Sequence, residues 1–155
     1  MTTLHRRTFL KATLGVSAVG LAASAGLLTP TRVLAAEWPK NAFDAKSIAD
    51  ALKDLYGASA STASGSIKIK APIQAENGAV VPIAVSTNLP NVQGIAVFVE
   101  KNAQPLIANV TLHGAEGYLS ARMKMGQTSD VHVVCKAGGK LYSAKQTIKV
   151  TVGGC

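Results

Sequence analysis

LYSAKQTIKVTV, at residues 141–152, alternates apolar and polar side chains from Ile148 onward. Strict alternation is the pattern of a β-strand that buries one face. The tripeptide Gly153-Gly154-Cys155 follows directly. Because glycine has no Cβ and adopts most backbone conformations, two in succession uncouple Cys155 from the strand. The stretch therefore predicts a strand that ends in a flexible arm, residues 153–155, which carries a thiol.

Upstream, the chain continues as a series of short β segments. Apolar runs predict seven strands, at residues 66–73, 79–86, 92–100, 106–112, 118–125, 130–136 and 141–152. Ile67, Ile69 and Ile73 share one parity, which predicts a common face. Pro82 has no N–H to donate and predicts an edge or a bulge in its strand. Seven strands separated by turns such as Gly138-Gly139 predict an all-β fold, an immunoglobulin-like antiparallel β-sandwich.

A short N-terminal helix is predicted before the strands. Ser47 is a good N-cap residue, and Asp50 follows it at the spacing of a capping box. Gly57 is a natural stop signal. An earlier start near Asn41 is the alternative. The apolar residues between cap and stop recur at helical spacing, at Ile48, Leu52 and Leu55.

Residues 1–36 have the pattern of an export signal. HRRTFLK, at residues 5–11, resembles the twin-arginine signal core R-R-x-F-L-K, and a weakly apolar stretch follows at 12–28. Small residues predict cleavage after Ala35 or Ala36. We therefore expect a folded domain over residues 37–152, located in the periplasm and free of the membrane once the signal is cleaved. A signal anchor that stays attached is the alternative.

The charge of the chain argues against nucleic acid as a partner. The formal net charge is +8, but residues 1–36 contain four basic residues and no acidic one. The remaining 12 basic and 8 acidic residues are scattered, with few aromatic residues between them. Nucleic-acid binding proteins concentrate their basic residues on one face. A mild positive field instead favours small anions and acidic partner surfaces.

The two cysteines are expected to be unpaired. If Gly138-Gly139 turns a hairpin, Cys135 lies roughly opposite Leu141, fourteen residues before Cys155. That distance is up to about 45 Å along a strand, whereas a disulfide needs Cα atoms within about 7 Å. Cys135 is in phase with its apolar strand neighbours and is predicted to be a buried core thiol. Cys155 is then a free thiol, and its own terminal carboxylate is expected to disfavour the thiolate.

No set of residues in the sequence forms a recognisable catalytic or metal site. His113 and His132 each stand without a carboxylate or cysteine at ligand spacing. Glu100-Lys101 and Asp130 are interpreted as strand-end charges. Motifs for phosphate, dinucleotide, zinc or nucleophilic serine chemistry are missing. The sequence therefore predicts no catalytic residue, no metal and no cofactor.

With these features established, the chain resembles the SoxY family of sulfur carriers. The resemblance rests on the export signal, the helix at 47–57, VPIAVSTNLP at 81–90 and IAVFVEKNAQPLIANVTL at 95–112. It rests most on GKLYSAKQTIKVTVGGC at 139–155. The family motif continues with further glycine after the cysteine, and here the sequence stops at Cys155. Cys135 is not part of the family's carrier motif.

The resemblance implies both a function and a set of partners. Cys155 would be the covalent sulfur attachment site, and Gly153 and Gly154 would form its swinging arm. A SoxZ-like subunit would form a heterodimer or a higher oligomer with the chain and be exported with it, because twin-arginine export moves folded proteins. SoxAX would join thiosulfate to the cysteine, SoxB would release sulfate, and SoxCD would oxidise the remaining sulfur. The chain itself would be a carrier and not an enzyme.

Two other functions remain open from the residues alone. A periplasmic structural or adhesive β-sandwich module could use Cys155 for an interchain disulfide. A thiol enzyme is the third hypothesis, although no base or orienting group accompanies the cysteine.

Overall fold

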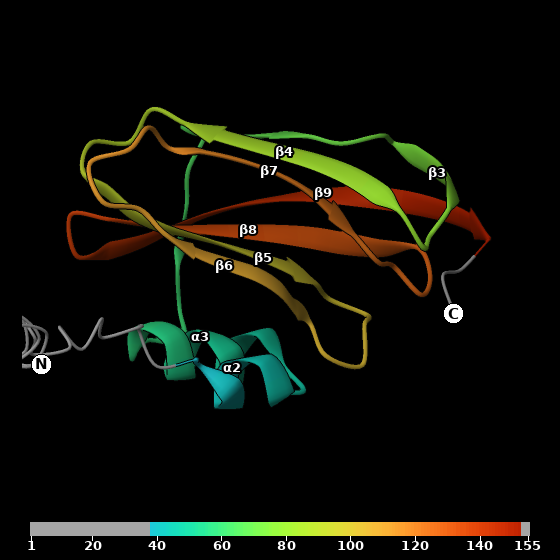
Figure 1. The fold of residues 1–155 in the computed structure, drawn as a ribbon, viewed down its shortest axis with the longest axis horizontal. Helices are drawn as coiled ribbons and strands as arrows, with labels where there is room; N and C mark the ends of the chain where they lie inside the picture. Colours follow the sequence, from blue (N-terminus) through green and yellow to red (C-terminus); the bar gives the residue numbers. More distant parts are fainter. Residues whose placement is uncertain (1–37, 153–155) are drawn as a thin grey trace, which may run out of the picture. The chain divides into compact units, whose positions relative to one another are not determined.

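The computed structural model describes residues 38–152, so the predicted signal at 1–36 and the arm at 153–155 lie outside the described residues. Within 38–152 the chain forms two short helices followed by a series of strands (Figure 1). The helices are α2 (Lys40–Asp44) and α3 (Ile48–Tyr56). The strands are β1 (Thr62–Ala63), β2 (Ile67–Lys70), β3 (Gln74–Asn77), β4 (Val81–Thr87), β5 (Val92–Val99), β6 (Leu106–Thr111), β7 (Tyr118–Met123), β8 (Ser129–Ala137) and β9 (Lys140–Val152).

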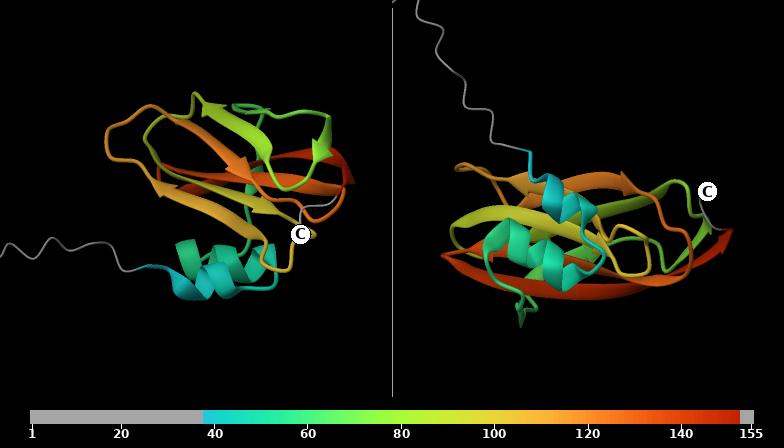
Figure 2. Two further views of the ribbon diagram at one scale, coloured as in Figure 1. Left: turned by 45° about the vertical axis from the view of Figure 1, so that its right-hand side comes forward. Right: turned by 90° about the horizontal axis from the view of Figure 1, so that it is seen from below.

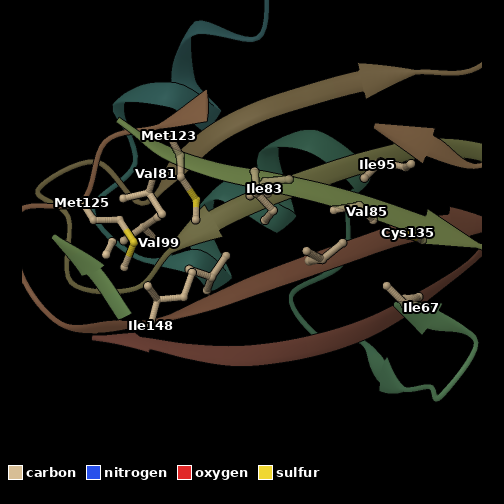
Figure 3. Packing of buried hydrophobic residues seen from close by; sticks show 14 residues of the cluster. Ile67, Val81, Ile83, Val85, Ile95, Val99, Met123, Met125, Cys135 and Ile148 are labelled. Carbon is tan, nitrogen blue, oxygen red and sulfur yellow. The ribbon is translucent and has the colours of Figure 1, made fainter. Parts of the chain in front are cut away.

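The strands form two sheets that face each other across an apolar core. The larger sheet has the order β1-β9-β8-β5-β6, with β3 also paired to β9, and the smaller has the order β2-β4-β7. Side chains from both sheets fill the space between them, as Figure 3 shows for the buried isoleucine, valine and methionine residues. The all-β prediction is therefore confirmed. Its identification as immunoglobulin-like stays a prediction.

The predicted helix is present, and its capping residues act as expected. The Oγ of Ser47 accepts a hydrogen bond from the Asp50 N–H at 3.1 Å. Gly57 adopts a φ of 72°, which favours glycine, and its N–H donates to the Lys53 carbonyl at 2.8 Å. The segment near Asn41 does not extend this helix but forms the separate helix α2.

Both helices cover the outer face of the larger sheet (Figures 1 and 2). A second apolar cluster joins Leu52 of α3 to Phe98 of β5 and Val134 of β8. The Tyr56 hydroxyl donates to Asn109 Oδ1 of β6 at 3.0 Å, and burial raises the pKa of Tyr56 to about 12. β5 is thus buried on both faces, which explains its near-continuous apolar sequence.

Two strands were missed by the sequence prediction, and the antiparallel assignment needs a correction. β1 and β3 each pair with β9 in parallel, at Tyr142–Ser143 and at 149–152 respectively. The strand predicted at 66–73 ends at Lys70, and Ile73 is 76% exposed whereas Ile67 is 5% exposed. Short strands such as β1 and β3 have too few residues to show a periodic pattern. Whether such a segment forms a strand depends on pairing with a partner that is distant in sequence, here β9.

The prediction that Pro82 marks an edge strand or a bulge is wrong, because β4 is the middle strand of its sheet and pairs without a register shift. β2 pairs with β4 only from Ala84 to Thr87. β7 pairs with β4 from Val81 to Ser86. Around Pro82 one side of β4 is therefore without a partner strand, and the missing N–H removes no hydrogen bond there.

We expect Ile67→Ala to lower the free energy of unfolding by about 2–5 kcal/mol, because it opens a cavity between the sheets. Ile73→Ala is the matched control and should change it by less than about 0.5 kcal/mol, because Ile73 is exposed. Urea unfolding of both variants measures the two values. Equal losses would contradict the assignment of Ile73 to the surface.

Candidate functional site

The predicted arm, Gly153-Gly154-Cys155, lies outside the described residues, but the strand from which it continues is well defined. β9 runs to Val152, whose side chain is 65% exposed. The candidate site is therefore built from the arm root, which we define as residues 149–152 of β9 together with the residues that hold them.

On one flank the arm root is tied to β3. Asn77 pairs with Val152, and the Gly78 N–H donates to the Val152 carbonyl at 2.8 Å. The Thr151 hydroxyl donates to the Glu76 carbonyl at 3.0 Å. The last described residue of the chain is thus held by backbone hydrogen bonds, so the arm starts from a fixed point.

The segment between β7 and β8 holds the other flank. The Thr128 hydroxyl accepts from the Val150 N–H at 2.9 Å and contacts the Val150 carbonyl at 3.4 Å. The Met125 N–H donates to the Gly78 carbonyl at 2.7 Å, which links this segment to β3. Met125 itself is fully buried in the core. Both flanks of the arm root are therefore anchored to the body.

Cys135 lies deep in the core, as the sequence predicted. It is fully buried, and it pairs with Ile95 and Tyr142, one residue from the predicted Leu141. Burial raises the pKa of its thiol to about 11, because a thiolate loses its hydration in an apolar core. Figure 3 shows it beside Ile95, away from Met125 and Ile148.

The same geometry separates Cys135 from the arm. Val152 is ten positions along β9 from Tyr142, which lies opposite Cys135. Ten strand residues span about 33 Å, and three arm residues span at most about 11 Å. The Cα atoms of Cys135 and Cys155 therefore stay about 20 Å apart or more, beyond the reach of a disulfide within one chain.

His132 has no carboxylate at ligand spacing in the sequence, but the fold gives it one as a neighbour. Its Nε2 lies 3.2 Å from Glu100 Oε2, which the β5–β8 pairing brings from 32 residues away. Sequence spacing could not reveal this pair, because it depends on strand register. The second histidine, His113, lies in a loop that lines a hollow of about 960 Å³ at the other end of the sandwich.

Glu100, Asp130 and His132 also form a cluster with ligand-type atoms within 4.8 Å of one another. Both oxygens of Asp130 already accept hydrogen bonds, from Thr147 and from Lys145. These hydrogen bonds, that from Thr147 first, lower the pKa of Asp130. Because the Lys145 cation lies against the carboxylate that a metal would need, we assign no metal to this cluster.

No helix within residues 38–152 has the length and apolar character needed to cross a membrane.

Comparison with known proteins adds a family and a set of similar structures. The family model described as sulfur oxidation protein SoxY matches residues 52–155. The solved structure of the sulfur carrier protein SoxY from Chlorobium limicola f thiosulfatophilum is 38% identical, with a TM-score of 0.63, and covers 73% of this chain and 99% of that chain. No curated protein matches the chain.

A more distant structure shares the fold alone. The superoxide reductase (neelaredoxin) from Ignicoccus hospitalis is 18% identical, with a TM-score of 0.50, and covers 55% of this chain and 80% of that chain.

The burial of Cys135 leads to a thiol-titration prediction. With an aromatic disulfide reagent at pH 8, we expect one reactive thiol per native chain and two in denaturant, because Cys135 is buried with a pKa of about 11. Cys155→Ser should leave none in the native protein. Two reactive thiols in the native wild type would contradict the core position of Cys135.

The raised pKa of the Cys135 thiol also makes the stability of the fold depend on pH. The unfolded thiol ionises near its ordinary pKa of 9 and the folded one near 11, so the unfolded state releases its proton first as the pH rises. The free energy of unfolding should therefore fall between about pH 9 and 11. The Cys135→Ala variant should show a smaller fall in the free energy of unfolding over the same pH range.

Proposed function

Because the chain belongs to the SoxY family of sulfur oxidation proteins, it is a sulfur carrier of the Sox system, and we propose that it holds thiosulfate-derived intermediates covalently on Cys155. The observation that carries this proposal is the family match, which runs through Cys155, combined with an arm root that is anchored on both flanks. The burial of Cys135 supports the choice of Cys155 as the sulfur that reacts.

The proposed first step is an oxidation. The Cys155 thiol and thiosulfate form a sulfur–sulfur bond, Cys–S–S–SO3⁻, and release one proton and two electrons, which a SoxAX-like haem enzyme accepts. Hydrolysis by a SoxB-like enzyme then adds water, releases sulfate and a proton, and leaves a persulfide. A SoxCD-like enzyme would oxidise that sulfur further. In this proposal the carrier supplies no catalytic group to these steps. A SoxZ-like subunit binds the chain and completes the carrier complex.

The geometry explains why a carrier would be built in this way. The arm root is held by hydrogen bonds, while the two glycines after it have no side chains. A short arm on a rigid body keeps the bound sulfur at high local concentration near its next enzyme. Because the two glycines have no side chains, the arm can also carry the cysteine into a narrow active-site channel. The periplasm and the twin-arginine route complete the proposal, supported by HRRTFLK at residues 5–11.

The first test is the mass of the carrier after reaction. After incubation of the complex with thiosulfate and SoxAX, intact-mass analysis should show an S2O3 adduct on the C-terminal peptide. Cys155→Ser should abolish the adduct, and Cys135→Ala should keep it, because only the first removes the attachment sulfur. A product of doubled mass that returns to the single mass on reduction would instead support the alternative function, a structural or adhesive β-sandwich module joined by an interchain disulfide of Cys155.

The second test concerns the arm. Gly153→Val combined with Gly154→Val keeps Cys155 but adds two branched side chains, which restrict the backbone and widen the arm. We expect enzymatic loading to slow by about tenfold or more, while alkylation by iodoacetamide stays near the wild-type rate. Unchanged loading would refute the swinging-arm role.

A further inference from the structure

A groove of about 550 Å³ opens between the β5–β6 connection and the end of β7. Its charged lining residues are Lys101, Arg122 and Lys124, and no acidic residue lines it. All three side chains are exposed. The groove is therefore a cationic depression in a surface of otherwise mixed charge.

Hydrogen bonds across the groove hold its shape. Asn102 Nδ2 donates to the Lys124 carbonyl at 2.7 Å, and Asn102 Oδ1 accepts from the Gly126 N–H at 3.2 Å. The Lys101 N–H donates to the Oγ of buried Ser129 at 3.0 Å. The two walls are thus joined through one side chain, so the cations lie on a preformed surface.

The acidic residues nearest in sequence do not neutralise the groove. Glu100 pairs with His132, and Asp130 pairs with Lys145. Among the described residues these are the two ion pairs, and neither includes a groove cation. Glu76 of β3 lies at the same end of the sandwich but does not line the groove. Within residues 38–152 none of the three cations is in an ion pair, although the Asp44 carboxylate accepts a hydrogen bond at 3.4 Å from Gln104, which lines the groove.

The groove lies next to the arm root. Gly78 bonds to Val152 on one side and to Met125 on the other, and Met125 stands between groove residues Lys124 and Gly126. Figure 1 shows the β5–β6 connection and the tip of β9 at the same end of the sandwich. Because three residues span at most about 11 Å, an enzyme that reacts with Cys155 has to cover this end.

We propose that this groove binds an acidic segment of the enzymes that act on Cys155, an inference that rests on the proposed carrier function. Its volume would hold well over ten waters at about 30 Å³ each, so a single small oxyanion would leave most of it filled with solvent. A stretch of acidic side chains fits both its size and its charge. Such complementarity raises the rate of encounter and sets orientation more than it tightens binding.

The test is charge reversal at the groove in the full carrier complex. With SoxAX and thiosulfate, Lys101→Glu/Arg122→Glu/Lys124→Glu should lower kcat/KM for adduct formation by about tenfold or more at low salt, with little change in kcat. The wild-type kcat/KM should fall as NaCl is added, and the variant should lose that dependence.

The matched control is Lys68→Glu/Lys70→Glu/Lys140→Glu, which makes the same change in net charge at exposed positions outside the groove. Its kcat/KM should stay within about twofold of wild type. A groove variant equal to this control, or to wild type, overturns the proposed docking site while the carrier function stands. A wild type that acquires no adduct overturns the carrier function, and the docking site with it.

Discussion

The rest of the structure depends on the pairing of β9 with β8. The ladder runs from Ala137 opposite Lys140 to Ser129 opposite Ile148, so β9 is held along most of its length. Its other edge accepts β1 near its start and β3 near its end. Because the last residues of β9 are paired in this way, the point at which the arm begins is set by backbone hydrogen bonds.

The same strand places the two sulfur atoms in different surroundings. Cys135 is paired near the beginning of β9, inside a dry core that disfavours its thiolate. Cys155 follows the other end of that strand, on two glycines. Reactivity of a thiol depends on access and on stabilisation of the thiolate. Burial in the core therefore makes the Cys135 thiol unreactive, and the proposed carrier chemistry uses the thiol of Cys155.

The charges at the arm's end of the sandwich are divided in a way that suits brief encounters. Glu100 and Asp130 are occupied by partners of their own, whereas Lys101, Arg122 and Lys124 are not. A carrier that meets several enzymes in turn gains from fast association and from equally fast release. Long-range attraction between exposed charges raises the association rate without a large buried interface.

The sequence by itself determined seven of the nine strands described in residues 38–152, the capped helix from Ser47 to Gly57, the burial of Cys135 and the separation of the two cysteines. These follow from local periodicity and from distance along one strand, which neighbouring residues encode. Only the tertiary structure decided the parallel pairing of β1 and β3 with β9, the exposure of Ile73 and the Glu100–His132 pair. It also decided that Lys101 and Lys124, more than twenty residues apart, line one groove beside the arm root. Contacts between distant segments depend on strand register, and no local pattern in the chain records it.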